Sequence, residues 1–114
     1  MGVIQLKTQL PGPRSRELMQ RRAAAVPRGS YQALPIFVAR AEGAVIEDVD
    51  GNRLIDFAGG IGSQNTGHRA ERVVSALRKQ LDAFMHMCFS VTPYEGYVRL
   101  AERMNQLVPG DFSK

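Results

Sequence analysis

Short runs of β-branched and aromatic residues occupy positions 36–57 and are typical of strands. Turn sequences separate these runs at Glu42-Gly43 and at Asp50-Gly51-Asn52, and the second is a strong hairpin signal. The pattern predicts a three-stranded antiparallel meander, with apolar runs at Ile36–Val38, Ala44–Ile46 and Leu54–Phe57.

Helical spacing precedes and follows this meander. A short helix is predicted from Ser15, a favourable N-cap residue, to about Ala25, because Val26 precedes a proline. Apolar residues three and four positions apart predict a second helix over 70–85. The sequence Thr92-Pro93-Tyr94-Glu95 has the form of a capping box, so a third helix is expected to begin there and to stop at Pro109-Gly110.

These elements predict an α+β chain with a short N-terminal helix, the three-stranded meander and two amphipathic helices. Residues 1–13 are interpreted as an irregular leader, and 14–114 as one ordered segment, because 114 residues leave no room for a second domain. The adjacent apolar pairs Val45-Ile46 and Leu54-Ile55 suggest that both faces of the sheet are partly covered.

The net charge of +4 permits nucleic-acid binding, but its distribution argues against it. Most of the excess lies in the Arg-rich N-terminal segment, and no basic run is interleaved with stacking aromatics. That segment faintly resembles an organelle transit peptide, but a solvated helix face in a cytoplasmic protein is the favoured interpretation. No apolar stretch is long enough to span a bilayer. We therefore expect no membrane partner, and the distribution of charge gives no reason to expect nucleic acid.

Candidate chemistry is sparse. The loop over 58–67 has the G-x-x-x-x-G spacing of a phosphate loop, but His68 stands where a lysine must reach the phosphates, which argues against ATP or NAD. His68 and His86 are interpreted as a helix-start and a boundary histidine rather than metal ligands, and no metal site is predicted. Cys88 is interpreted as a small buried hydrophobic residue rather than a nucleophile.

A family resemblance is carried by several segments in unbroken order: E-L-M-Q-R-R (Glu17–Arg22), P-I-F-V-A-R-A-E (Pro35–Glu42), D-V-D-G-N-R-L-I-D-F-A-G-G-I (Asp48–Ile61), N-T-G-H (Asn65–His68), H-M-C-F (His86–Phe89), T-P-Y-E-G-Y (Thr92–Tyr97) and M-N-Q-L-V-P-G-D-F (Met104–Phe112). From Leu18 onward the chain resembles the N-terminal part of the 4-aminobutyrate (GABA) aminotransferases. These are class III enzymes of fold type I that depend on pyridoxal 5'-phosphate.

The resemblance implies that the chain stops before the cofactor-binding large domain is complete. The family's glycine-serine phosphate turn, the aspartate that pairs with the pyridine nitrogen and the Schiff-base lysine all come later. Lys7, Lys79 and Lys114 match none of these positions. We therefore expect no catalytic and no cofactor-binding residue here, and no binding of pyridoxal phosphate by these residues alone.

The resemblance also implies a substrate contact. Ile61 aligns with the family's isoleucine that touches the carbon chain of the substrate, and Gly59 and Gly60 let the backbone bend close to a ligand. By the same resemblance, Cys88, Ser90 and Val91 border the pocket. The implied enzyme is a cytoplasmic homo-oligomer that transfers the amino group of GABA to 2-oxoglutarate, giving succinate semialdehyde and glutamate.

Two alternatives stay open at this point. The chain could come from another class III ω-aminotransferase that acts on ornithine or its acetyl derivative. It could also be a non-catalytic interaction module derived from such an enzyme.

Overall fold

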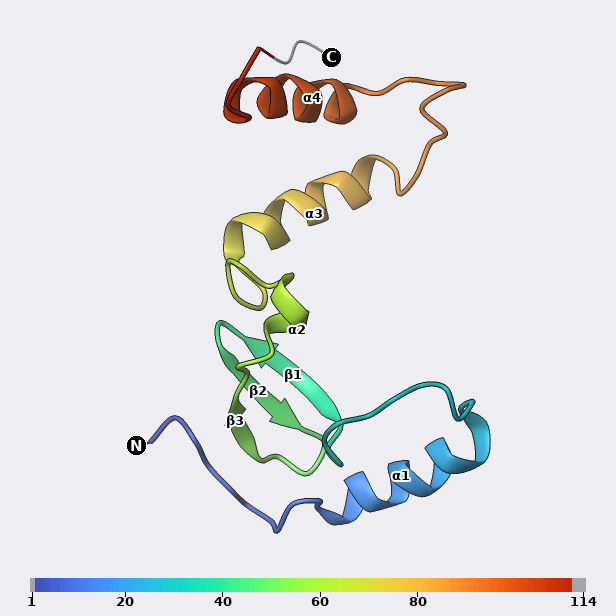
Figure 1. The fold of residues 1–114 in the computed structure, drawn as a ribbon, viewed down its shortest axis with the longest axis vertical. Coiled ribbons are helices and arrows are strands. Elements are labelled where there is room, and N and C mark those ends of the chain that lie inside the picture. The colour runs from blue at the N-terminus through green and yellow to red at the C-terminus, as the bar shows by residue number, and fades with distance from the viewer. Residues whose placement is uncertain (1, 112–114) are drawn as a thin grey trace. The chain divides into compact units, whose positions relative to one another are not determined.

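The computed structural model describes residues 2–111, and the chain divides into two units, residues 1–74 and 75–114. Helix α3 begins in the first unit and continues in the second. The elements in chain order are α1 (Pro13–Ala25), β1 (Val38–Glu42), β2 (Val45–Asp48), β3 (Arg53–Ile55), α2 (Gly59–Gly62), α3 (Glu71–Ala83) and α4 (Glu95–Leu107) (Figure 1). This order of elements confirms the predicted α+β class.

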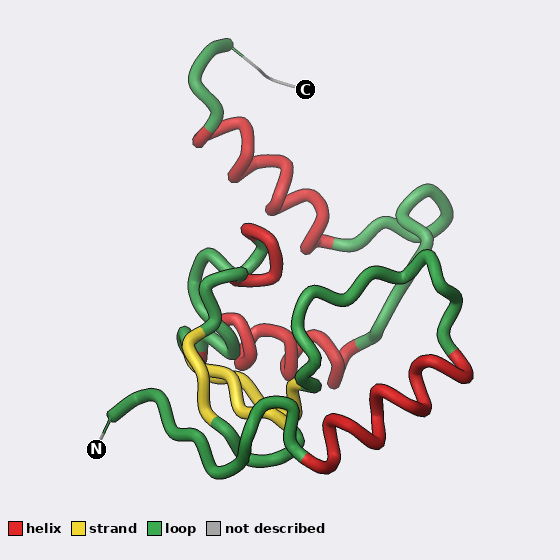
Figure 2. The backbone as a smooth tube through the Cα atoms, turned by 60° about the horizontal axis from the view of Figure 1, so that its bottom comes forward, coloured by secondary structure: helices red, strands yellow, loops and turns green. Residues whose placement is uncertain are grey.

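The three strands form the predicted antiparallel meander in the order β1-β2-β3 (yellow in Figure 2). Glu42 pairs with Val45 across the first turn, where Gly43 has a φ of 56°, and Ile46 pairs with Leu54. The first strand begins at Val38 rather than Ile36, which corrects the expected boundary. The ladder is irregular between Val38 and Arg40. Before Val38, the carbonyl of Phe37 accepts a 2.8 Å hydrogen bond from the Val49 N–H.

Asn52 joins the leader to the sheet. Its side chain is fully buried, and its Oδ1 accepts hydrogen bonds from the N–H groups of Lys7 (2.7 Å) and Thr8 (2.9 Å). Its Nδ2 donates to the Thr8 hydroxyl and to Oδ2 of Asp48, at 2.9 and 2.8 Å. Both ends of the amide are therefore satisfied, as burial of a polar group requires. A bridge between Gln5 and Arg53 continues the contact along β3.

Helix α1 starts two residues earlier than predicted, and its cap is not local. Gly12 is the N-cap residue and has no side chain that could accept a hydrogen bond from the free N–H groups, while Ser15 lies buried inside the first turn. The carboxylate of Asp50, in the β2–β3 turn, accepts hydrogen bonds from the N–H groups of Arg14 (2.7 Å) and Ser15 (2.9 Å). It thus satisfies donors that no helical carbonyl can reach. The end of the helix before Val26 is as predicted.

Asp50 is held as a carboxylate by this arrangement. Desolvation raises its pKa, but hydrogen bonds from the Ser15 hydroxyl and from the N–H groups of Arg14 and Ser15, with the Arg14 charge, outweigh that effect. The net result is a pKa below the ordinary value for aspartate. A negative charge at this end of α1 is also favoured by the helix dipole.

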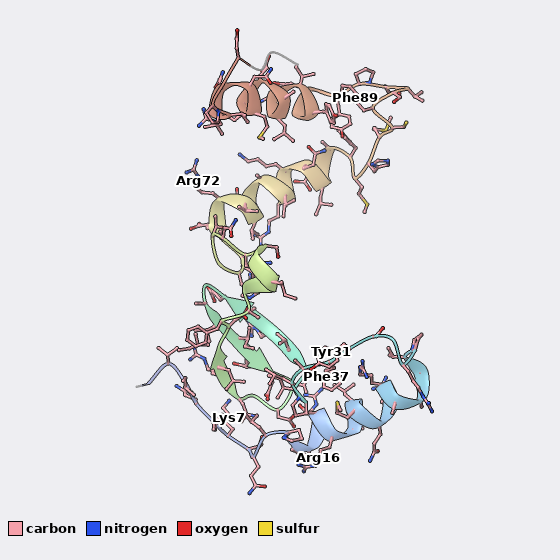
Figure 3. The ribbon with its side chains drawn as sticks, in the orientation of Figure 1. Lys7, Arg16, Tyr31, Phe37, Arg72 and Phe89 are labelled. Atoms are coloured by element: carbon pink, nitrogen blue, oxygen red, sulfur yellow. The ribbon has the colours of Figure 1, made fainter. Side chains whose placement is uncertain are left out.

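In the second unit, α4 starts at Glu95, so the expected capping box at Thr92-Pro93 is wrong. Tyr94 is the N-cap residue and is extended, and no side chain caps the helix. The Tyr94 ring meets Phe84 and Phe89 edge-on, with centroids 5.6 and 5.5 Å apart, and Phe89 also contacts Tyr97 (Figure 3 labels Phe89). Aromatic packing, rather than a polar cap, sets the entry into α4.

Burial over the described residues 2–111 is polar rather than apolar. Ser15, Asp48 and Asn52 are buried, and no hydrophobic side chain of these residues is. The predicted apolar stripes of α3 and α4 exist but are exposed, with Leu81 and Leu107 at 60% and 59%. Hydrogen-bonded turns therefore organise the first unit. No helix of the described residues has the length and apolar content to cross a membrane.

Candidate functional site

The loop from Asp56 to His68 closes on the turn between β1 and β2. The N–H of Asp56 donates to the Ala44 carbonyl at 2.9 Å. At the other end, His68 and Gly43 exchange backbone hydrogen bonds of 2.8 and 2.9 Å. The two ends of the loop are thus fixed to neighbouring residues of one turn, so the loop is a defined structure although it lies between elements.

The Asp56 carboxylate bonds to both sides of this loop. Its Oδ1 accepts hydrogen bonds from the N–H groups of Ala58 (2.9 Å) and Gly59 (3.0 Å). Its Oδ2 accepts a 2.6 Å hydrogen bond from Nε2 of His68. The hydrogen bond from His68 and then that from the Gly59 N–H hold the pKa of Asp56 below its ordinary value.

A cavity of about 340 Å³ opens beside this pair. Its lining consists of Gly43, Ala44, Asp56, Gly59, Gln64, Thr66, Gly67 and His68. Asp56 and His68 are the ionisable residues of this lining, and their side chains are hydrogen-bonded to each other. The lining offers polar groups that can orient a ligand, among them the side chains of Gln64 and Thr66, but it contains no lysine to form a Schiff base.

Ile61, within this loop, has a rare backbone conformation. Its φ of 54° and ψ of 56° are left-handed, which for a β-branched residue is a genuine outlier. Such a residue costs on the order of 1–3 kcal/mol and persists only where its surroundings impose it. Its side chain is 95% exposed, so it packs against no described part of the chain.

The sequence predicted an irregular loop at 58–67, and the structure replaces part of it with the short helix α2. Gly59 and Gly60 also have positive φ values, 48° and 60°, which glycine adopts readily. The Ile61 N–H donates to the Ala58 carbonyl at 2.7 Å, and the Ser63 hydroxyl to the Gly60 carbonyl at 2.9 Å. The segment Gly59–Gly62 is four residues long and contains three glycines, so the spacing of apolar residues could not reveal α2.

The comparisons with known proteins agree with one another. The family model described as aminotransferase class-III matches residues 25–114. The chain belongs to the class-III aminotransferases. This assignment confirms the resemblance found in the sequence.

Several class-III relatives are named for their substrates. The chain is 54% identical over 109 residues to the 4-aminobutyrate aminotransferase of Mycobacterium tuberculosis, covering 96% of this chain and 24% of that protein. It is 57% identical over 97 residues to a 5-aminovalerate aminotransferase of Pseudomonas putida, covering 85% and 23%. The chain therefore spans about a quarter of the length of these relatives.

Solved aminotransferase structures share the fold. An omega-transaminase from Sphaerobacter thermophilus superposes with a TM-score of 0.76 at 28% identity, over 88% of this chain and 24% of that one. An acetylornithine aminotransferase from Elizabethkingia anophelis superposes with a TM-score of 0.73 at 22% identity, over 82% of this chain and 24% of that one. At this identity the second likeness concerns the fold alone.

Class-III aminotransferases use pyridoxal phosphate, but the described residues do not fit that cofactor by themselves. Lys7 lies against Gly51 in the β2–β3 turn, and Lys79 is exposed on α3 (Figure 3 labels Lys7). Neither lines the cavity beside Asp56 and His68. Lys114 lies outside the described residues. No group of three or more metal-ligating side chains occurs among residues 2–111 either.

The expected pocket residues fall into two sets. Gly59, Gly60 and Ile61 are together on α2, and Gly59 also lines the cavity. The other set, Cys88, Ser90 and Val91, is exposed in the second unit, which corrects the expectation that Cys88 is buried. These residues lie in a turn where the Cys88 carbonyl accepts a 3.0 Å hydrogen bond from the Val91 N–H. The structure thus brings the first three together, and their contact with substrate stays a prediction.

Sequence reasoning missed the pairing of Asp56 with His68. His68 was interpreted as a plain helix-start histidine, and Asp56 was not singled out. They are 12 positions apart and meet only because the loop returns to the β1–β2 turn. Gly67 and Arg69, on either side of the histidine, have positive φ values and mark a sharp turn. The sequence alone does not show which residues this turn brings next to His68.

Proposed function

We propose that this chain is the N-terminal part of a 4-aminobutyrate aminotransferase. Such an enzyme transfers the amino group of GABA to 2-oxoglutarate and yields succinate semialdehyde and glutamate. The observation that supports this most is 54% identity over 96% of the chain to a protein of that name. Pyridoxal phosphate, when bound in such an enzyme, supplies the electron sink for the exchange, and it would be held by segments other than residues 2–111.

Within that enzyme, residues 56–68 would form part of the substrate wall. GABA has an apolar methylene chain between its charged ends, and the exposed aliphatic side chain of Ile61 can exclude water along it. Gly59 and Gly60 carry no side chain, so the backbone can approach the ligand closely. Cys88, Ser90 and Val91 are proposed as further lining residues, because all three are exposed in one loop.

Homo-oligomer formation and a cytoplasmic location belong to the same proposal. The exposed apolar stripes of α3 and α4 support the first, since surfaces of this kind mark interaction sites. The second comes from the sequence interpretation of the Arg-rich N-terminal segment, whose Arg16 and Arg21 lie exposed on α1 (Figure 3 labels Arg16). Sedimentation of the enzyme, and its fractionation from cells of the source, test these two statements.

A second candidate substrate is 5-aminovalerate, because the relative of that name is 57% identical over 97 residues. It is longer than GABA by one methylene, and one methylene changes specificity by about 10–200-fold. The two candidates therefore differ measurably in kcat/KM although their chemistry is the same.

The test starts from the DNA downstream of Lys114. A reading frame that continues and encodes a glycine-serine turn and a later lysine supports an enzyme, whereas a stop codon supports the interaction module. The product of a continuing frame is then assayed with GABA, 5-aminovalerate, ornithine and acetylornithine as donors and 2-oxoglutarate as acceptor. The highest kcat/KM is expected for GABA, and a higher value for any other donor would overturn the assignment.

A further inference from the structure

The left-handed conformation of Ile61 must be imposed by its surroundings, because a β-branched residue does not adopt it on its own. The Ile61 side chain, at 95% exposure, makes no packing contact that could impose it. The cause must therefore lie in the backbone hydrogen bonds of the loop and in whatever fixes them.

One fixed point is the Asp56 carboxylate. Its Oδ1 binds the N–H groups of Ala58 and Gly59, the peptide groups that lead into Gly60 and Ile61. This oxygen can stay in place only if the carboxylate does not rotate. The second oxygen prevents rotation, because Oδ2 is held at 2.6 Å by Nε2 of His68.

The other fixed point is the backbone of His68. It exchanges two hydrogen bonds with Gly43, and Gly67 approaches the same turn so closely that an added Cβ would lie 3.1 Å from the Gly43 oxygen. The imidazole thus projects from a backbone that is tied to the sheet. In the first unit, the chain of contacts runs from Gly43 through His68 and Asp56 to Ala58 and Gly59, two residues before Ile61.

We infer that Asp56 and His68 are positioning residues that hold the turn carrying Ile61, and so set the apolar wall against which the carbon chain of the amino donor lies. The role of that wall rests on the proposed function, whereas the clasp itself, meaning the Asp56–His68 contact, does not. His68 acts through Asp56, and neither residue needs to touch the reacting atoms.

The first test measures the backbone of Ile61 in the 114-residue chain by NMR scalar couplings that report the sign of φ. His68→Phe keeps a ring but removes the donor, and we expect Ile61 to lose its positive φ. His68→Gln keeps an N–H near the position of Nε2, and we expect the positive φ to be retained. His86→Phe, at the exposed second histidine, is the matched control. A positive φ at Ile61 in His68→Phe would overturn the inference.

The second test uses the complete enzyme that carries this segment, with the same variants. We expect His68→Phe to raise KM for GABA about tenfold or more, and His68→Gln to restore it, because misplacement of a positioning group is costly. A purely structural role would lower the folded fraction and leave KM unchanged, and that result would refute the inference. Asp82→Asn on the exposed face of α3 serves as control.

The two tests separate the clasp from the proposed function. If the unaltered enzyme does not use GABA, the function fails, and the NMR comparison still decides the clasp. If the 114-residue chain gives no dispersed spectrum, hydrogen exchange of residues 57–64 in the complete enzyme replaces the couplings. Faster exchange in His68→Phe with recovery in His68→Gln supports the clasp, and equal exchange in all variants contradicts it.

Discussion

The hydroxyl of Ser15 donates a 2.5 Å hydrogen bond to the carboxylate of Asp50, a residue 35 positions later in the chain. This contact connects the first turn of α1 to the β2–β3 turn, and it involves a serine that is fully buried. Because no apolar side chain is buried among residues 2–111, such polar contacts have an unusually large share in holding the first unit together.

We expect Ser15→Ala to weaken this attachment. The variant loses a buried hydrogen bond, worth about 1 kcal/mol on average. Ser75→Ala is the matched control, because it makes the same change on an exposed turn of α3 and gains the same helix propensity. Hydrogen exchange of the backbone N–H groups at positions 14 and 15 measures the effect. About fivefold faster exchange is expected in Ser15→Ala alone, and equal rates in both variants would contradict the role given to this serine.

Gly12 is expected to tolerate no side chain. A Cβ added there would lie 2.2 Å from Cγ of Asp50, so the carboxylate would have to leave the helix end. Gly12→Ala should therefore lower the free energy of unfolding by about 1–3 kcal/mol. Gly29→Ala is the control, because nothing lies within 4 Å of its added Cβ. Urea unfolding followed by circular dichroism compares them, and equal midpoints would show that Asp50 does not need this space.

The Asp56–His68 contact should lose its contribution to stability when the pH falls into the acid range. The pKa of Asp56 is lowered in the folded chain from its ordinary value of 3.8. Its contribution to stability is therefore fully present above that value and is lost as the pH falls through the lower, folded pKa. Amide shifts of Ala58 and Gly59 should accordingly move at a pH below 3.8. Asp56→Asn should abolish the transition, and a midpoint above that value in the unaltered chain would show that the carboxylate is not stabilised.

The sequence predicts those parts of the fold that depend on residues close together along the chain. The hairpin at Asp50-Gly51-Asn52 and the apolar stripe of α3 are local patterns, and both are found. The start of α1 was misplaced because Ser15 is a good cap by composition, whereas the structure takes its cap from Asp50. The start of α4 was misplaced because the aromatic contacts of Tyr94 keep its backbone extended.

The candidate site divides in the same way. Gly59, Gly60 and Ile61 could be selected because glycines after a strand indicate a bend, and because the family resemblance covers them. The partner of His68 could not be selected, since it depends on a return of the chain to Gly43. The left-handed backbone of Ile61 was equally hidden, because isoleucine is the wrong residue type from which to expect it.

The 114-residue chain is expected to form no specific adduct with pyridoxal phosphate. Lys7 and Lys79 do not line the described cavity beside Asp56, so no lysine of residues 2–111 is placed for such chemistry there. Incubation followed by gel filtration and absorbance spectroscopy tests this. Free lysine at matched concentration gives the non-specific background. A saturable band above that background which survives gel filtration would refute the expectation.

Ile61→Ala separates a role in the substrate wall from a role in packing. If Ile61 were a core residue, its truncation would cost about 2–5 kcal/mol. The side chain is 95% exposed, so we expect a change in the free energy of unfolding within about 0.5 kcal/mol. In the complete enzyme we expect a higher KM for GABA, or a lower kcat/KM, with the kinetics of 2-oxoglutarate less affected. Val91→Ala, at 80% exposure, makes the corresponding truncation at the other proposed lining segment and shows which of the two touches the donor. A large drop in melting temperature with unchanged GABA kinetics would exclude the wall, because the side chain would then be needed for folding and not for the ligand.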